Sequence, residues 1–314
     1  MPSFSEENLE NQKHTGRIGQ IWIYLGKLFR IFLHERGWKV FPMAAIVSLI
    51  VASVCNNVFV NMEGTQVGAL AFACVCIWNG FFNSIQSICK ERPIIKREHR
   101  AGMHISSYIA AHMIYQAFLC FGQTLIQLGI YKLCGFPFPE AGPVSGNFIV
   151  DFGVTLFIIT YASDLLALMV SCIVKDTTTA MTVVPFLLIL QLIFSGVAFE
   201  LSGITDKISQ FMISRWGIRT ICTVANFNSL HSISLYAAVN KLTTVKEVSL
   251  IYKYIRNSEM WTIIGETSTK NMMNTAYEFT ASNMWLEWGV LLGMGLLFVI
   301  VGTLFLEGID KDSR

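Results

Sequence analysis

Charged residues are scarce in this chain of 314 residues. Asp, Glu, Lys and Arg make up 14% of it, whereas hydrophobic residues make up 53%. A soluble domain carries about 25% charged residues, so the composition excludes a soluble globular protein and predicts an integral membrane protein. The net charge of +2 and the lack of a long basic run indicate no nucleic-acid partner.

The signatures of several enzyme and metal-site classes are also absent. The sequence has no C-x-x-C, no H-E-x-x-H, no G-x-S-x-G and no G-x-x-x-x-G-K-S/T. We therefore expect no catalytic residue, no metal site and no cofactor bound by this chain itself. Cys134 and Cys222 fall in segments expected outside the membrane, and a disulfide between them stays open. The lack of an N-x-S/T acceptor favours a bacterial origin.

Six long apolar runs dominate what is present. Each is near the roughly 20 residues that a helix needs to cross about 30 Å of hydrocarbon. We expect an all-α polytopic membrane protein whose six transmembrane helices lie at residues 40–60, 67–88, 108–131, 148–174, 180–201 and 285–305.

Basic residues in the short loops set the expected orientation. Eight of the eleven residues from 90 to 100 are charged or His, with five Lys or Arg against two Glu. Because basic short loops stay inside, this loop and both termini should be cytoplasmic, and residues 202–284 should form an extracytoplasmic segment. Within it, the spacing of apolar and basic residues around 245–256 suggests an amphipathic helix, with a flexible polar loop as the alternative.

The residues before the first span have a different pattern. One helical stripe is apolar and the opposite face is cationic, formed respectively by Ile21, Leu25, Leu28 and Phe32, and by Lys27, Arg30 and His34. Such a helix lies in the membrane surface, although a simple extension of the first span is the alternative. We expect residues 1–39 to be a cytoplasmic tail with this helix, and residues 40–314 to be the six-span domain.

The charged loop also carries an ordered motif. It reads E-R-P-I-x-x-R-E-x-x-x-G-x-x-x-S-x-Y from Glu91 to Tyr108. This motif resembles the first cytoplasmic loop of type-2 ABC transporter permeases, closest to the G-subfamily-like (type V exporter) branch. In that family the loop is a coupling helix that rests on the ATPase. The resemblance implies that the residues coupling this chain to the ATPase are Glu91, Arg92, Arg97, Glu98 and Gly102.

A second ordered pattern is similar to the fourth and fifth spans and the following re-entrant region of the same family. It comprises Leu168, Ser171, Asp176, Ala180, Pro185, Gln191, Phe194, Ser195, Gly196, Ser214, Arg215 and Trp216. The resemblance implies an exporter subunit that faces a second copy or a paralogue in a dimer, surrounded by membrane lipid. ATP and Mg²⁺ would be bound by a separately encoded ATPase subunit. Residues 226–282 match nothing in that family.

Polar residues within the spans suggest a cargo path. In the resembled family the second and fifth spans line the central cavity, which implies a path along Asn79, Phe82, Asn83, Gln191 and Phe194. Amides also join helices by hydrogen bonds, so packing is an equal alternative.

Asp164 lies near the middle of the fourth span. A carboxylate there costs about 2.5 to 3.5 kcal/mol, so it should face a bundle interior or a cavity. It is either a cargo or proton contact or a structural hydrogen bond between helices.

Five residues of the last span carry further expectations. Gly289 and Gly293 form a G-x-x-x-G motif that favours close helix approach. Trp285 and Trp288 should anchor the outer membrane interface, with Glu287 at the wet boundary.

Two functions remain open from the sequence. The first is the transmembrane subunit of an ATP-driven exporter. The alternative is a non-transporting immunity or sensor protein on the same scaffold, which the unmatched extracytoplasmic segment suggests.

Overall fold

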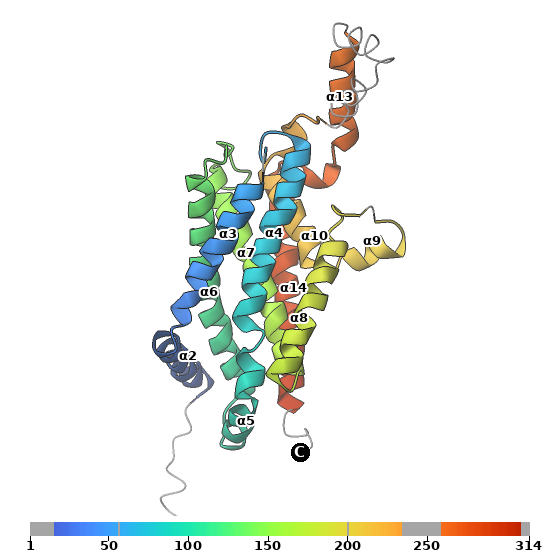
Figure 1. Ribbon diagram of the computed structural model, residues 1–314. Coiled ribbons are helices and arrows are strands. Elements are labelled where there is room, and N and C mark those ends of the chain that lie inside the picture. Colours follow the sequence, from blue (N-terminus) through green and yellow to red (C-terminus); the bar gives the residue numbers. More distant parts are fainter. Residues whose placement is uncertain (1–15, 56, 200, 234–258, 309–314) are drawn as a thin grey trace, which may run out of the picture.

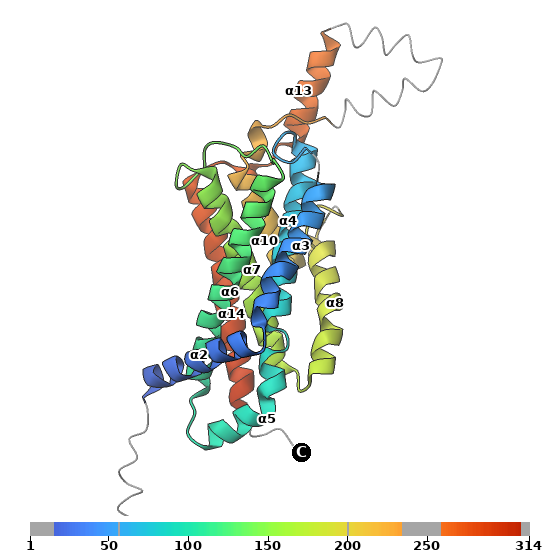
Figure 2. The same cartoon turned by 60° about the vertical axis from the view of Figure 1, so that its left-hand side comes forward.

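The computed structural model describes residues 16–55, 57–199, 201–233 and 259–308. The described residues are almost entirely helical, with one isolated bridge between Asn61 and His231. The amphipathic helix expected at 245–256 lies outside the described residues. The prediction of an all-α polytopic membrane protein is confirmed (Figures 1 and 2).

Five segments of the described chain are long and apolar enough to cross a membrane. They are Gly37–Val54 with helix α3 (Val40–Val54), Met62–Arg100 with α4 (Met62–Ser84) and α5 (Ser87–Arg100), α6 (Ile105–Leu133), α7 (Phe148–Ile173) and α14 (Ala281–Glu307). A sixth apolar helix, α8 (Thr177–Ile193), has only 17 residues.

Polar side chains cap the amino-terminal ends of α4 and α7. Asn61 accepts a hydrogen bond from Gly64 N at 2.7 Å, and Asn147 accepts one from Ile149 N at 2.9 Å. Such caps satisfy amides that have no partner inside the helix. They explain why α4 and α7 begin at the polar residues that interrupt the apolar runs.

Helix α8 ends earlier than its apolar run predicts. The expected span 180–201 stops as a helix at Ile193, and the chain turns at Gly196, whose φ is +80°. A residue with positive φ ends a helix, and glycine adopts that conformation without strain. The chain then forms α9 (Ile204–Ser209) and α10 (Ile213–Val224).

Helix α10 returns into the bundle rather than staying in an outer loop. It packs against α4, α7 and α14, and nine of its twelve residues are buried. A Cβ on Gly217 would lie 3.2 Å from Ile159 Cδ1, so glycine lets α10 approach α7 closely. This is the re-entrant region that the family resemblance implied.

Helix α7 is the centre of the core, flanked by α4 and α14. Glycines set both approaches: a Cβ on Gly80 of α4 would lie 2.4 Å from Thr160 O, and one on Gly295 of α14 would lie 2.9 Å from Leu165 Cδ1. The G-x-x-x-G prediction is wrong within the described chain, because a Cβ on Gly289 or Gly293 would meet nothing within 4 Å.

The tryptophans of α14 differ from each other. Trp285 is 61% exposed, as an interface anchor should be, whereas Trp288 is 4% exposed and donates a hydrogen bond from Nε1 to Thr155 Oγ1 at 3.1 Å. The prediction for Trp288 is therefore wrong, because its indole packs into the core. Cys134 and Cys222 are both free thiols.

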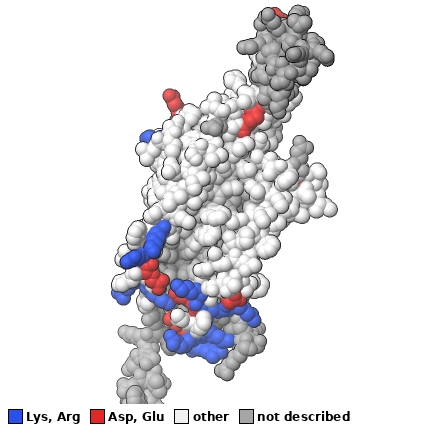
Figure 3. Space-filling view, viewed as in Figure 1, with Lys and Arg blue, Asp and Glu red and all other residues white. Residues whose placement is uncertain are grey.

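Basic side chains gather at one end of the molecule, where α2 (Arg17–His34) and α5 lie (Figure 3). We call this the charged end. Helix α2 runs sideways from the bundle there (Figure 2), with Leu25 and Leu28 packed against Ala111 of α6. Arg30 and His34 are exposed. This arrangement fits a helix in the membrane surface.

Candidate functional site

Helix α5 lies at the charged end, and its first turn is fixed to the end of α7. Ser171 Oγ accepts hydrogen bonds from Ile88 N at 3.0 Å and Cys89 N at 3.1 Å. Arg92 Nη1 donates to Cys172 O and Val174 O, each at 2.9 Å. Amides that begin one helix and carbonyls that end the other thus satisfy their hydrogen bonds across the contact.

The two glutamates of α5 point toward α2 and α6. Glu91 Oε2 lies 3.1 Å from Lys27 Nζ and accepts a hydrogen bond from Tyr108 Oη at 3.1 Å. Glu98 accepts one from Tyr24 Oη at 3.0 Å. Burial, and then this bond to Glu98, raise the pKa of Tyr24 to about 12. Both carboxylates therefore hold α5 against its own subunit.

The opposite face of α5 is exposed. Lys90, Pro93, Ile94 and Arg97 have the i, i+3, i+4 and i+7 spacing of one helical stripe, and all four are exposed. We call these four residues the α5 stripe. The helix ends at a turn through Gly102, with φ +99°.

The five residues predicted to couple this chain to an ATPase thus lie in three different settings. Arg97 lies on the α5 stripe. Glu91, Arg92 and Glu98 make contacts inside the subunit, and Gly102 forms the turn. Lys90, Pro93 and Ile94 share the α5 stripe with Arg97 but were not among the five predicted residues.

The six predicted cargo-path residues do not share one surface. Asn79 and Asp164 are buried, and Asn83 exchanges hydrogen bonds of 2.8 and 3.0 Å with Gln123 of α6. Phe82 is 44% exposed beside Trp78, with ring centroids 5.0 Å apart.

Gln191 and Phe194 lie at the end of α8. Gln191 Oε1 accepts a hydrogen bond from Ser214 N at 2.9 Å and so positions the start of α10. Phe194 is half-buried at the carboxyl end of α8.

An ion pair that sequence reasoning missed joins α10 to α14. Arg219 Nε lies 2.7 Å from Glu287 Oε1, and Arg219 Nη2 donates to Asn283 Oδ1 at 3.0 Å. Thr223 Oγ1 also donates to Glu287 Oε1 at 3.1 Å. The Glu287 side chain is completely buried, so its predicted place at the wet boundary is wrong. Burial is possible because the re-entrant α10 brings Arg219 to it.

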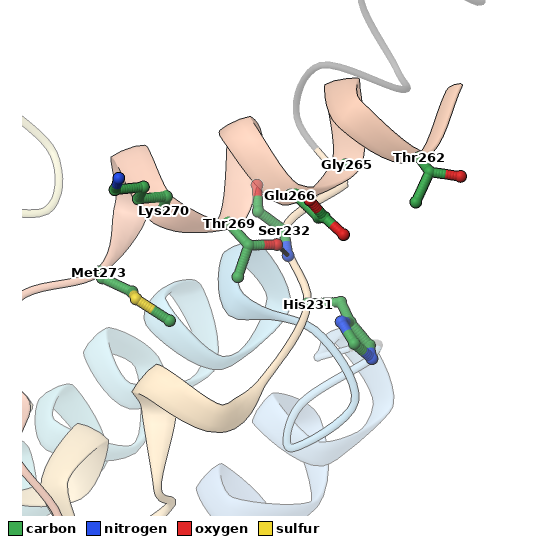
Figure 4. A pocket seen from close by; sticks show the side chains of 8 residues that line it. All are labelled: His231, Ser232, Thr262, Gly265, Glu266, Thr269, Lys270 and Met273. Carbon is green, nitrogen blue, oxygen red and sulfur yellow. Dashed lines mark hydrogen bonds between the residues drawn. The ribbon is translucent and has the colours of Figure 1, made fainter. Parts of the chain in front are cut away.

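A pocket of about 620 Å³ lies at the end opposite α5, between α13 (Met260–Met272) and the segment at 231–232 (Figure 4). Its lining comprises His231, Ser232, Thr262, Gly265, Glu266, Thr269, Lys270 and Met273. Glu63 of α4 holds one side in place, since its Oε1 accepts hydrogen bonds from Ser232 Oγ at 2.6 Å and Ile233 N at 2.9 Å.

These features define a class: a multi-pass α-helical membrane protein with a surface helix, a fixed helix across one end and a re-entrant helix before its last span. The chain matches the family described as ABC-2 type transporter over residues 20–223 and belongs to it. The matched residues are thus a permease component, the membrane part of an ABC transporter, and this domain is not itself an ATPase.

One curated protein is similar to this chain. It is the ABC transporter ATP-binding/permease protein Rv1747 of Mycobacterium tuberculosis (strain ATCC 25618 / H37Rv), with 26% identity over 226 residues. The similarity covers 67% of this chain and 26% of that protein, so the chain spans about a quarter of its length.

Proposed function

We propose that this chain is the transmembrane subunit of an ATP-driven exporter. It forms half of the translocation path with a second copy or a paralogue, and a separately encoded ATPase subunit binds ATP and Mg²⁺. The observation that carries the proposal is the α5 stripe, an exposed face on a helix whose other sides are fixed to α2, α6 and α7. The similar mycobacterial protein is named as an ATP-binding/permease protein, which supports an ATP-linked role.

The contacts of α5 give it a means of transmitting movement. It follows α4 in the chain after a short turn, and Ser171 and Arg92 fix its first turn to α7. Helices α4 and α7 pack along each other through Gly80. A push on the stripe by a partner is therefore passed to two spanning helices. Since basic residues gather here, we place this end and both termini in the cytoplasm.

Two exposed apolar surfaces are suited to contact the second subunit, which would form the other half of the path. Helix α8 has few contacts with the rest of the subunit, and Phe186, Ile189 and Ile193 are exposed on it. Trp78 and Phe82 are each 44% exposed on α4. Burial of such surface against a second subunit stabilises at roughly 25 cal/mol per Å² in water, and less where lipid competes.

The α5 stripe can be tested by placing negative charges on it. Arg97→Glu and Ile94→Asp should leave the permease folded but reduce copurification of the ATPase and its cargo-stimulated ATP hydrolysis. Lys132→Glu is a matched control, because Lys132 is exposed at the other end of α6. Wild-type coupling in both stripe variants would refute docking at α5, and recovery of a folded wild-type permease without any ATPase would refute the exporter.

The pocket in Figure 4 favours a second candidate, a non-transporting sensor or immunity protein. It lies beyond the residues that match the transporter family. Thr262→Trp would fill it. A sensor loses its phenotype with this change and keeps it when the partner ATPase is inactivated, whereas an exporter loses its phenotype with the ATPase.

A further inference from the structure

Buried polar atoms without a hydrogen-bond partner are concentrated in one part of the described chain, the inner faces of α4, α6 and α7. Six of the seven such atoms lie there, namely Asn79 Nδ2, His112 Nδ1 and Nε2, Gln116 Oε1, Thr124 Oγ1 and Asp164 Oδ2, and the seventh, Glu287 Oε2, lies on α14. More than 90% of buried polar groups in proteins are paired, and each unpaired one costs about 1–3 kcal/mol. A core built for packing alone would not collect five such side chains, so these residues indicate a function beyond packing.

Asp164 is the innermost member of this group. Its side chain is completely buried, and only Oδ1 has a partner, Ser84 Oγ at 2.8 Å. Its titratable neighbours are Tyr115 and Cys120 on α6 and Tyr161 on its own helix.

No base or cation pairs with Asp164 among the described residues. Helix α4 offers it only the Ser84 hydroxyl, and α14 approaches α7 nearby through Gly295 against Leu165, which is apolar. An ionised carboxylate would be an uncompensated buried charge. Its second oxygen is suited to carry a proton and to donate it to water.

Polar side chains of α6 form a file between the level of Ser84, the partner of Asp164, and the charged end. Gln116 Nε2 donates to Asn83 O at 3.5 Å, beside Ser84, and His112 lies one helical turn from Gln116 toward the charged end. The His112 ring contacts the Tyr108 ring with centroids 4.7 Å apart, and Tyr108 Oη donates to Glu91. The His112 and Gln116 side chains of this file have unpaired polar atoms that can bind water.

We propose that this file is an internal proton site, in which Asp164 exchanges a proton with the aqueous phase at the charged end through waters held by His112 and Gln116. In uptake, an O–H bond forms at Asp164 Oδ2 while one O–H bond of the adjacent hydronium breaks, and the other waters relay the charge inward. Release is the reverse. The site lies inside one subunit and is independent of the exporter role. Ser84, the hydrogen-bond partner of Asp164, is the last residue of α4. A proton that binds Asp164 therefore binds next to the start of α5.

The test is infrared spectroscopy of the purified full chain in lipid nanodiscs, in H₂O and after transfer to D₂O. The C=O stretch of a protonated carboxyl shifts when its proton is exchanged for deuterium. Wild type should show an exchanging band from a buried acid that the Asp164→Asn variant lacks. A wild-type spectrum without this band, or a band that persists in Asp164→Asn, would overturn the proposal.

Asp151→Asn is the matched control. Asp151 lies on the same helix and is also buried, but its oxygens accept hydrogen bonds from Val144 N at 2.8 Å and Ser145 N at 3.1 Å. Its carboxylate is satisfied in the ionised form, so the exchanging band should survive this change.

A second variant tests the route. His112→Phe keeps the ring but removes both nitrogens, and it should slow deuterium exchange of the Asp164 band by about tenfold. An unchanged exchange rate would contradict the route through His112. If Asp164→Asn fails to fold, Ser84→Ala decides the assignment, because loss of the 2.8 Å donor must shift the frequency of the Asp164 band.

Discussion

Lys27 Nζ in α2 and Glu91 Oε2 in α5 lie 3.1 Å apart, and their side chains are 33% and 19% exposed. The same glutamate oxygen accepts the Tyr108 hydroxyl of α6. One carboxylate thus joins three helices at the charged end. The angle of α5 across that end depends on this contact as well as on the links to α7.

Breaking this ion pair should loosen α5. We expect Glu91→Gln or Lys27→Gln to lower the free energy of unfolding by about 1 kcal/mol, because the pair is only partly shielded from water. The exchanged pair, Lys27→Glu with Glu91→Lys, should recover part of the loss. Urea unfolding in detergent, arranged as a double-mutant cycle, measures the coupling, and a coupling of zero would contradict the role of the pair.

Gly80 should tolerate no side chain. A Cβ there would lie 2.4 Å from Thr160 O and 2.7 Å from Asp164 N, both backbone atoms that cannot move aside. We expect Gly80→Ala to destabilise the protein by about 1–3 kcal/mol by separating α4 from α7. Gly293→Ala in α14, where a Cβ meets nothing, is the control. Equal thermal stability of the two variants would argue against the close approach.

The buried carboxylate of Glu287 should depend on Arg219. Removing one partner of a buried ion pair leaves an uncompensated charge, so Arg219→Ala should cost about 3–5 kcal/mol. Adding Glu287→Leu to that variant should restore stability, because no charge is then buried. Melting temperatures of the two variants give the comparison. A double variant less stable than Arg219→Ala would show that Glu287 has another role.

Asp176, which caps α8, should make the stability of this helix depend on pH. The Thr179 backbone N–H donates to Asp176 Oδ1 at 2.8 Å and lowers the pKa of this carboxyl below its ordinary value of 3.8. A depressed pKa in the folded protein stabilises it above the ordinary value, and this contribution is lost as the pH falls through the lowered pKa.

Asp176→Asn keeps a cap of similar quality without the charge. Wild type should therefore melt slightly above this variant at neutral pH, and the difference should vanish in acid. A difference that is constant with pH would contradict the assignment, since it would not come from ionisation.

The helices that form the site could be predicted from local sequence. The stripe of α2, the charged segment of α5 and the apolar runs are periodic features, and their helices form nearly where the period predicts. The predicted bounds failed at α8, which ends at Ile193 shortly before the turn at Gly196.

Other assignments depended on which helix lies beside which. Glu91 and Arg97 are both charged residues of one helix, and only the positions of α2 and α6 decide that Glu91 points inward. Close packing of α14 likewise follows Gly295 rather than the motif at Gly289 and Gly293, because α7 lies on that side.

The sequence by itself determined that this protein spans a membrane, which end carries the positive charge and which family it resembles, because composition, charge and local motifs do not depend on long-range contacts. Only the tertiary structure decided which polar residues are buried and with what partners. Arg219 reaches Glu287 because α10 re-enters the bundle, and Asp164 meets Ser84 because Gly80 lets α4 and α7 touch. Such pairings join residues 68 and 80 positions apart, beyond the reach of any helical period.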